Sequence, residues 1–316
     1  MYPRWEQSTV CLCLSMPGAS ALFLGNAKQL GLRLNNLDAL ILSHNHYDHT
    51  GGVEFLIDLY ADVPPIFGHP KAFCQSYRKL RTGEVQQNDQ QPGRAIGFPY
   101  PPGLADLQKR GVRLTKNREP LKIHEDIWLS GEVARNCSFE GVGENFFADP
   151  QLTQKDDLPD DQALVLNTHK GLIVIVGCCH SGIVNTLEAA RSLFPGVPLW
   201  AIVGGFHLLH ANAQRIKKSV SYVENLGSPG SCSRALYGLR CALQPEKSLR
   251  QTLPCSVGGR ALLPPGLRGV ADVRAAYLDE AGSVKNYPFN PRAALFLVSS
   301  MMSFRLILSR CFSMTS

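Results

Sequence analysis

The sequence predicts an α/β protein in which apolar strands lead to polar clusters and are then followed by helices. Three strand-like runs each lead to a histidine: 38–43 before His44, 171–177 before His180, and 199–206 before His207. Helical spacing of apolar residues follows each of them. This repeated order predicts a layered fold in which one end of the strands carries the chemistry.

Composition is typical of a folded globular protein rather than a disordered one. The 316 residues are 44% hydrophobic and 18% charged, enough to bury a sizeable core. The net charge of +6 is scattered, and only Lys217 and Lys218 are adjacent lysines, so we expect no nucleic-acid partner. Ten cysteines without a Cys-x-x-Cys pair favour a reduced, cytoplasmic protein over a disulfide scaffold.

The C-terminal apolar run, residues 293–308, is too short for a typical membrane span. It has 16 residues and contains Arg305, whereas a spanning helix needs about 20 apolar residues. We therefore expect no membrane partner, and we interpret this run as a packed or poorly ordered tail.

The first polar cluster is the stretch "ILSHNHYDHTGG", residues 41–52. It places His44, His46, Asp48 and His49 directly after a predicted strand and before two glycines. Buried imidazoles and carboxylates are costly unless they have partners. On a tight loop, two imidazoles can face one cation while the carboxylate and the third imidazole face a second. Such ligands suit divalent zinc, or alternatively manganese or iron.

His180 and His207 are predicted to complete this coordination from two other strand ends. The resulting site would hold two divalent ions, which can activate water and stabilise an oxyanion. In such a site Asp48 is the predicted catalytic residue. Its carboxylate would stay ionised beside a dication, so it would orient the nucleophile and accept a proton rather than donate one.

We assign no role in the site to the other histidines, cysteines and aspartates near these motifs. A lone histidine is usually solvated or satisfied, which applies to His69, His124, His169 and His210. Cys178 and Cys179 are interpreted as small buried apolar residues. Asp160 and Asp161 are interpreted as a solvated turn with at most one capping role.

These stretches resemble the signature of the metallo-β-lactamase fold superfamily. Within it the chain is most similar to the 7,8-dihydropterin-6-methyl-4-(β-D-ribofuranosyl)aminobenzene-5′-phosphate synthase-like group. The resemblance runs over residues 22–226 and is carried by "NAKQLGLRLNNLDALILSHNHYDHTGG", "SGEVAR", "DDQALVLNTHKGLIVIVGCCHSGIVNTLEAAR" and "AIVGGFHLLHA". It implies a four-layer αββα sandwich of α/β (α+β) class, with a two-metal site at one edge.

The resemblance implies two kinds of reaction. Members of the narrower group join a pterin methyl diphosphate to the amine of a ribofuranosylaminobenzene phosphate and release diphosphate. Members of the wider superfamily hydrolyse phosphoesters, lactones, thioesters or β-lactams. In either case the expected substrate is a small molecule, phosphorylated or otherwise anionic. A weakly active or vestigial metal-binding scaffold is the third alternative.

Two departures from the group's pattern bear on the site and on the domain boundary. The group carries His-Cys-Thr-Gly near its C-terminus, but Ser231 stands here in place of that histidine, which predicts a weaker second metal position. Beyond residue 265 nothing resembles the group. We therefore predict one metallo-β-lactamase-like domain over 1–265 and an unassigned C-terminal extension over 266–316.

Overall fold

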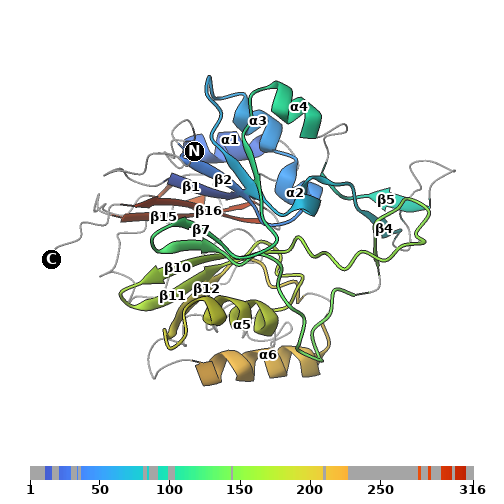
Figure 1. Ribbon diagram of the computed structural model, residues 1–316, viewed down its shortest axis with the longest axis vertical. Coiled ribbons are helices and arrows are strands. Elements are labelled where there is room, and N and C mark those ends of the chain that lie inside the picture. Colours follow the sequence, from blue (N-terminus) through green and yellow to red (C-terminus); the bar gives the residue numbers. More distant parts are fainter. Residues whose placement is uncertain are drawn as a thin grey trace.

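The computed structural model describes residues 11–15, 21–29, 34, 37–80, 84, 92–98, 104–143, 145–208, 211–226, 277–278, 284–285, 293–300 and 303–310. Two β-sheets lie face to face, and helices cover the outer face of each (Figure 1). The structure is thus the αββα sandwich that the sequence predicted.

The first sheet has six strands in the order β15-β16-β1-β2-β3-β6. The strands β1, β2, β3 and β6 run parallel, and β16 pairs with β1 in the antiparallel sense. Their bounds are β1 (Cys11–Ser15), β2 (Ala39–Leu42), β3 (Ile66–Gly68), β6 (Leu114–Lys116), β15 (Ala293–Ser300) and β16 (Ser303–Arg310). The helices that cover this sheet are α1 (Leu22–Gln29), α3 (Val53–Ile57) and α4 (Leu104–Lys109).

The second sheet has five strands in the order β12-β11-β10-β8-β7. All neighbours are antiparallel except β11 and β12, which run parallel. The strands are β7 (Leu121–His124), β8 (Ile127–Leu129), β10 (Leu164–Thr168), β11 (Gly171–Ile175) and β12 (Leu199–Val203). The covering helices are α5 (Ile183–Leu193) and α6 (Ala213–Leu226).

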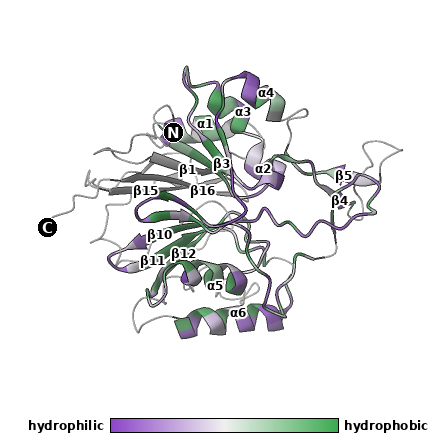
Figure 2. Cartoon of the chain, viewed as in Figure 1, coloured by the Kyte–Doolittle hydropathy of each residue, from purple (hydrophilic) through white to green (hydrophobic). Residues whose placement is uncertain are grey.

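The strand β2 shows why the sequence there is an unbroken apolar run. Side chains of successive strand residues point to opposite faces. Ala39 and Ile41 pack between the two sheets, whereas Leu40 and Leu42 pack under the helices. Both faces of β2 are therefore dry. Figure 2 shows hydrophobic residues concentrated in the sheets, whereas α6 carries many hydrophilic residues.

Smaller elements connect these layers. A third sheet, in the order β5-β4-β9, projects to one side of the sandwich (Figure 1). Its strands are β4 (Tyr77–Lys79), β5 (Gly93–Ala95) and β9 (Phe146–Phe147). The remaining elements are the short helix α2 (Tyr47–Thr50), the 3-10 helix η1 (Pro70–Phe73) and the pair β13 (Tyr277–Leu278) and β14 (Val284–Lys285).

The structure revises two local expectations. The loop at the first polar cluster is shorter than predicted, because helix begins at Tyr47 and takes in Asp48 and His49. Of the apolar run 293–308, residues 293–300 and 303–308 lie in β15 and β16, and β16 pairs with β1, which favours the packed alternative over a poorly ordered tail. The domain boundary at 265 stays a prediction. In the part of the chain that the structure describes, no helix has both the length and the apolar character needed to cross a membrane.

Leu164 tests the contribution of the layer between the sheets. Its side chain is fully buried there and pairs with Leu129 and Ile175 on the flanking strands. Leu164→Ala should lower the free energy of unfolding by about 2–5 kcal/mol, because it removes buried methyl groups and leaves a cavity. Leu59→Ala is the control, since Leu59 is 44% exposed. Denaturant titration that found equal effects for the two variants would contradict this description of the core.

Candidate metal centre

The predicted histidines meet because strand ends from both sheets lie at one edge of the sandwich. His44 follows β2, His180 follows β11, and His207 follows β12. The two sheets approach each other closely at Gly177, where a Cβ atom would lie 2.3 Å from Ser43 Oγ and 3.3 Å from His44 Nδ1. Only glycine allows this approach.

The imidazole rings form one continuous cluster. The centroid of His44 lies 4.6 Å from that of His46, 4.2 Å from that of His49 and 4.8 Å from that of His180. The centroid of His180 lies 4.8 Å from that of His46 and 4.4 Å from that of His207. Five of the six residues predicted as metal ligands are thus neighbours in space, although three different segments supply them.

The buried imidazoles of the cluster have ring nitrogens without protein partners. His44 Nε2, His46 Nε2 and both ring nitrogens of His180 are buried and accept or donate no hydrogen bond among the described residues. Leaving such polar atoms unmatched costs free energy, so native structures rarely do so. Metal ions would resolve this cost, because neutral imidazole nitrogens are preferred ligands of zinc and related ions.

The electrostatics keep these imidazoles in the form that binds metal. Burial lowers the pKa of His46 to about 4. Burial, together with the neighbouring imidazoles, lowers the pKa of His44 and of His180 well below its usual value. At neutral pH these rings are therefore uncharged, and their lone pairs are available for a cation.

Asp48 and His49 reach the cluster from α2. His49 Nε2 lies 3.6 Å from Asp48 Oδ2, and the Asp48 side chain is 42% exposed. Asp48 therefore lies at the accessible side of the site, while His49 is buried. This difference in exposure follows from the helix, which turns the two neighbouring side chains in different directions.

Cys178 also belongs to this site, contrary to its interpretation as a structural apolar residue. Its Sγ lies 2.9 Å from His49 Nε2. Ligand atoms of Cys178 come together with those of His44 and His180 in one group, and with those of Asp48 and His49 in another. Cys178 is thus placed between two candidate metal positions. Burial raises the pKa of its thiol, an effect that a bound dication would oppose.

The neighbouring Cys179 does keep its structural role. Its sulfur is buried and lies 3.5 Å from Thr186 Oγ1, and it packs in the core beneath the second sheet. Its backbone is left-handed, with φ of 57°, so successive side chains diverge there. One cysteine of the pair therefore faces the histidines and the other faces the helices.

His207 and Phe146 form the outer side of the cluster. His207 is exposed, and its backbone is also left-handed, with φ of 46°. The ring of Phe146 stacks on that of His46 with centroids 5.3 Å apart, and it lies 5.5 Å from His180 and 6.4 Å from His207. Phe146, which the sequence did not single out, therefore narrows the approach to the histidines.

Asp160 and Asp161 are buried beside the site, so the prediction of a solvated turn is wrong. An Asp160 oxygen accepts a hydrogen bond of 2.7 Å from the backbone N–H of Asn45, and an Asp161 oxygen accepts one of the same length from that of Ser181. The two carboxylates thereby fix the segments that carry the histidines. Burial, and then the nearby Asp156, raise the pKa of Asp160 to about 7.

His69 and His169 agree with their structural interpretations. His69 accepts a hydrogen bond from the backbone N–H of Lys71, and its Nε2 lies 2.7 Å from an oxygen of Glu132. His124 ends β7, and His169 is exposed at the turn between β10 and β11. His210 and Ser231 lie outside the described residues.

Comparisons with known proteins find relatives of this chain in one superfamily. The family described as the metallo-beta-lactamase superfamily matches residues 13–196. The 7,8-dihydropterin-6-methyl-4-(beta-D-ribofuranosyl)-aminobenzene-5′-phosphate synthase of Methanocaldococcus jannaschii is 28% identical over 226 residues, which are 69% of this chain and 72% of that protein. An uncharacterised protein of the same organism is 28% identical over 208 residues, 66% of this chain and 72% of its own length.

One solved structure is similar in both sequence and shape. It is Tm1679, described as a metal-dependent hydrolase of the beta-lactamase superfamily. Tm1679 is 27% identical, covers 73% of this chain and 82% of its own, and superposes with a TM-score of 0.56.

His46→Ala should lower the amount of metal bound to the purified protein, because it removes a buried imidazole from the centre of the cluster. His169→Ala is the matched control, since that histidine is exposed on a turn. Plasma mass spectrometry should find a metal deficit in the first variant alone. Equal metal content in both variants would show that His46 binds no ion.

Cys178→Ala should remove a thiolate ligand, whereas Cys179→Ala should not. The measurement is the absorption spectrum of the protein loaded with cobalt(II), in which a thiolate ligand produces a charge-transfer band in the near ultraviolet. We expect the band in the parent protein and in Cys179→Ala, and its loss in Cys178→Ala. A band that persists in Cys178→Ala would assign the thiolate elsewhere.

Proposed function

The chain belongs to the metallo-beta-lactamase superfamily, and on this premise we propose that it is a metal-dependent enzyme acting on a small anionic substrate. Among the reactions of the superfamily we favour transfer, in which an arylamine displaces diphosphate from a pterin methyl diphosphate. The similarity over about two thirds of the chain to the dihydropterin-methyl-ribofuranosylaminobenzene-phosphate synthase supports this choice.

The observation that carries the proposal is the group of buried imidazoles whose ring nitrogens lack protein partners. A purely structural cluster of this kind would leave several polar atoms desolvated and unmatched, at a cost of about 1–3 kcal/mol for each. His44, His46 and His180 would hold one side of a two-ion centre. His49, Asp48 and Cys178 would hold the other side, and His207 lies at the rim.

Bound divalent ions, zinc before manganese or iron, would supply Lewis acidity toward an oxyanion leaving group or toward water. The chain's own residues supply the rest of the chemistry. We propose that Asp48 accepts a proton from the attacking group, and its 42% exposed side chain beside His49 supports this role. Phe146 narrows the approach and offers an aromatic ring beside His46, which suits a flat substrate ring.

In the proposed transfer, the carbon–oxygen bond between the pterin methyl group and the diphosphate breaks. A carbon–nitrogen bond forms to the aryl amine, diphosphate leaves with the bonding electron pair, and the amine loses a proton. Asp48 is the residue that we propose accepts this proton. The histidine cluster then faces the diphosphate oxygens, where the anionic charge of the leaving group develops.

Hydrolysis is the second candidate function, and the similarity to Tm1679, described as a metal-dependent hydrolase, favours it. Water would then replace the amine as the nucleophile, and a phosphoester, lactone or β-lactam would replace the pterin diphosphate. Asp48 would accept a proton in this reaction too.

We also propose that the protein works in a reduced, cytoplasmic setting without a nucleic-acid or membrane partner. Cys74, Cys137, Cys178 and Cys179 are free thiols. A reduced setting would protect the Cys178 thiol from oxidation whenever no metal is bound.

Asp48→Asn tests the proposed function. Asparagine keeps the shape and one oxygen but loses the charge, so turnover should fall by roughly 100-fold or more while folding stability changes little. Asp58→Asn is the control, because Asp58 is a more exposed carboxylate at the end of the adjacent helix α3.

The measurement is turnover by metal-loaded protein in a pterin-transfer assay and against a panel of phosphoesters and lactones. Transfer activity alone would support the synthase-like function, and activity on the panel alone would support hydrolysis. If metal-loaded protein is inactive in both assays, the weakly active or vestigial scaffold would be the supported alternative. An Asp48→Asn variant that keeps its metal and turns over as fast as the parent would remove Asp48 from the mechanism.

A further inference from the structure

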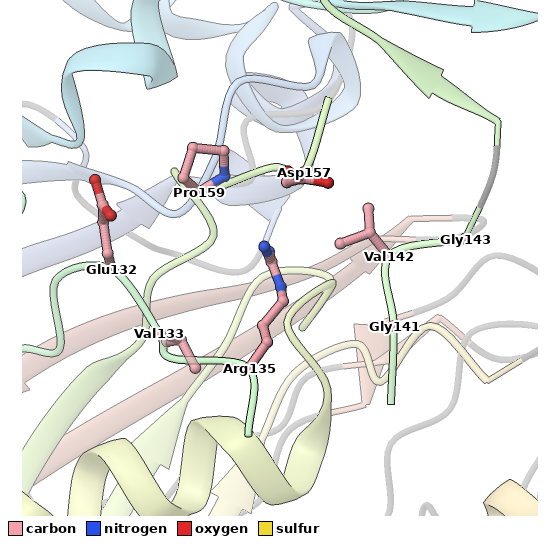
Figure 3. Close-up of a pocket in the computed structure, with 8 residues that line it drawn as sticks. All are labelled: Glu132, Val133, Arg135, Gly141, Val142, Gly143, Asp157 and Pro159. Carbon is pink, nitrogen blue, oxygen red and sulfur yellow. The ribbon is translucent and has the colours of Figure 1, made fainter. Parts of the chain in front are cut away.

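A cavity of about 440 Å³ lies beside the histidine cluster, and no residue of the mechanism above lines it (Figure 3). Three segments form its walls: 132–135, 141–143 and 157–159. Its volume is within the range of small-molecule sites. Arg135 is the cavity's one cationic lining residue, and Figure 3 shows its guanidinium reaching toward Asp157 and Pro159.

The topology brings this cavity to the same edge as the metal centre. β8 pairs antiparallel with β10, so the residues that follow β8 lie beside those that precede β10. β10 in turn pairs antiparallel with β11, whose end leads to His180. The segment 141–143 leads directly to Phe146, which contacts His46 and His180.

Two hydrogen bonds fix the guanidinium of Arg135. Its Nη2 donates hydrogen bonds to the carbonyl of Leu158, at 2.8 Å, and to Ser181 Oγ, at 3.3 Å. Ser181 is the residue after His180, so the guanidinium is tied to the metal-centre segment.

The guanidinium nevertheless lacks a full set of partners. Its Nε is buried and makes no hydrogen bond among the described residues. Of the carboxylates that line the cavity, Glu132 is engaged by His69 and Arg118. No ion pair within 4 Å joins Arg135 to Asp157 or to any other described carboxylate.

We propose that Arg135 binds an anionic group of the substrate, a phosphate or a carboxylate, while the reacting bond lies over the histidine cluster. This inference rests on the proposed function and names the residue that selects for an anion. A guanidinium presents several N–H donors in a fixed planar fork that matches phosphate and carboxylate oxygens. The cavity would thus hold the part of the substrate that does not react, which orients the part that does.

The test measures binding of inorganic phosphate, and separately of acetate, to the purified full-length chain by isothermal titration calorimetry. Arg135→Gln should weaken binding of the preferred anion roughly tenfold or more, since charge-assisted hydrogen bonds are lost. Arg135→Lys should keep part of the affinity. Arg191→Gln, which removes an exposed arginine on α5, should bind like the parent.

Val142→Asp is a second variant that leaves Arg135 in place but adds negative charge to the cavity wall, and it too should weaken anion binding. Phosphate and acetate distinguish the two possible anionic groups. Repeating the titrations after chelation separates binding at Arg135 from binding to metal, because only the former survives metal removal.

Metal content, measured on the same samples, keeps the two proposals apart. A chain that holds no metal but binds anions through Arg135 would overturn the proposed function and not this inference. A parent protein that binds neither anion, or an Arg135→Gln variant that binds as tightly as the parent, would overturn the inference even if the metal-loaded enzyme is active.

Discussion

The arrangement of the site depends on how closely the two sheets approach at Gly177. The backbone that leaves β11 passes against Ser43 and His44, which leave β2, and a side chain at position 177 would separate them. A backbone hydrogen bond of 2.8 Å from Gly205 to Gly177 then ties the end of β12 to the same point. Three strand ends, and with them the segments of His44, His180 and His207, are fixed by this one crossing.

A buried polar network holds these segments once they have met. Asp160 and Asp161 accept backbone N–H groups from the loops on either side of the cluster. Asn45 also donates to Ser76 Oγ, which in turn donates to Asp156. These hydrogen bonds join parts of the chain that are distant in sequence, so the network favours one arrangement of the loops over many. The buried ring nitrogens of His44, His46 and His180 make no hydrogen bond among the described residues, and we propose that they bind metal.

The start of helix α5 is fixed by a buried carboxylate close to the metal-centre segment. Glu140 accepts hydrogen bonds from the backbone N–H groups of Val184 and Asn185, and so caps the first turn. Gly182 has φ of 95°, and a Cβ atom there would overlap the Glu140 carboxylate. The capped helix anchors the segment that follows His180, while Arg135, which lines the cavity, keeps a buried Nε without a hydrogen bond among the described residues. The Glu140 carboxylate thus serves the fold, whereas Arg135 is the residue that we propose serves recognition.

Local sequence predicted the layered class, the apolar strands that lead to His44, His180 and His207, and the identity of the clustered histidines, although β2, β11 and β12 end one to three residues before the predicted runs do. It could do so because apolar periodicity and the spacing in "SHNHYDHTGG" are local properties that survive in any fold of this kind. The positions of Cys178 and Asp160 beside the histidines, and of Arg135 at the cavity, were decided by tertiary structure. Each of these residues lies near the end of a strand. Its surroundings come from segments that are distant in sequence and that strand pairing brings together, not from its neighbours in the chain. The hairpin of β10 and β11 did contain a signal, since residues before its first strand must lie beside residues after its second. Whether the carboxylates of Asp160 and Asp161, which precede β10, would be solvated or buried depended on how closely the second sheet packed on the first. Only the three-dimensional structure sets that distance.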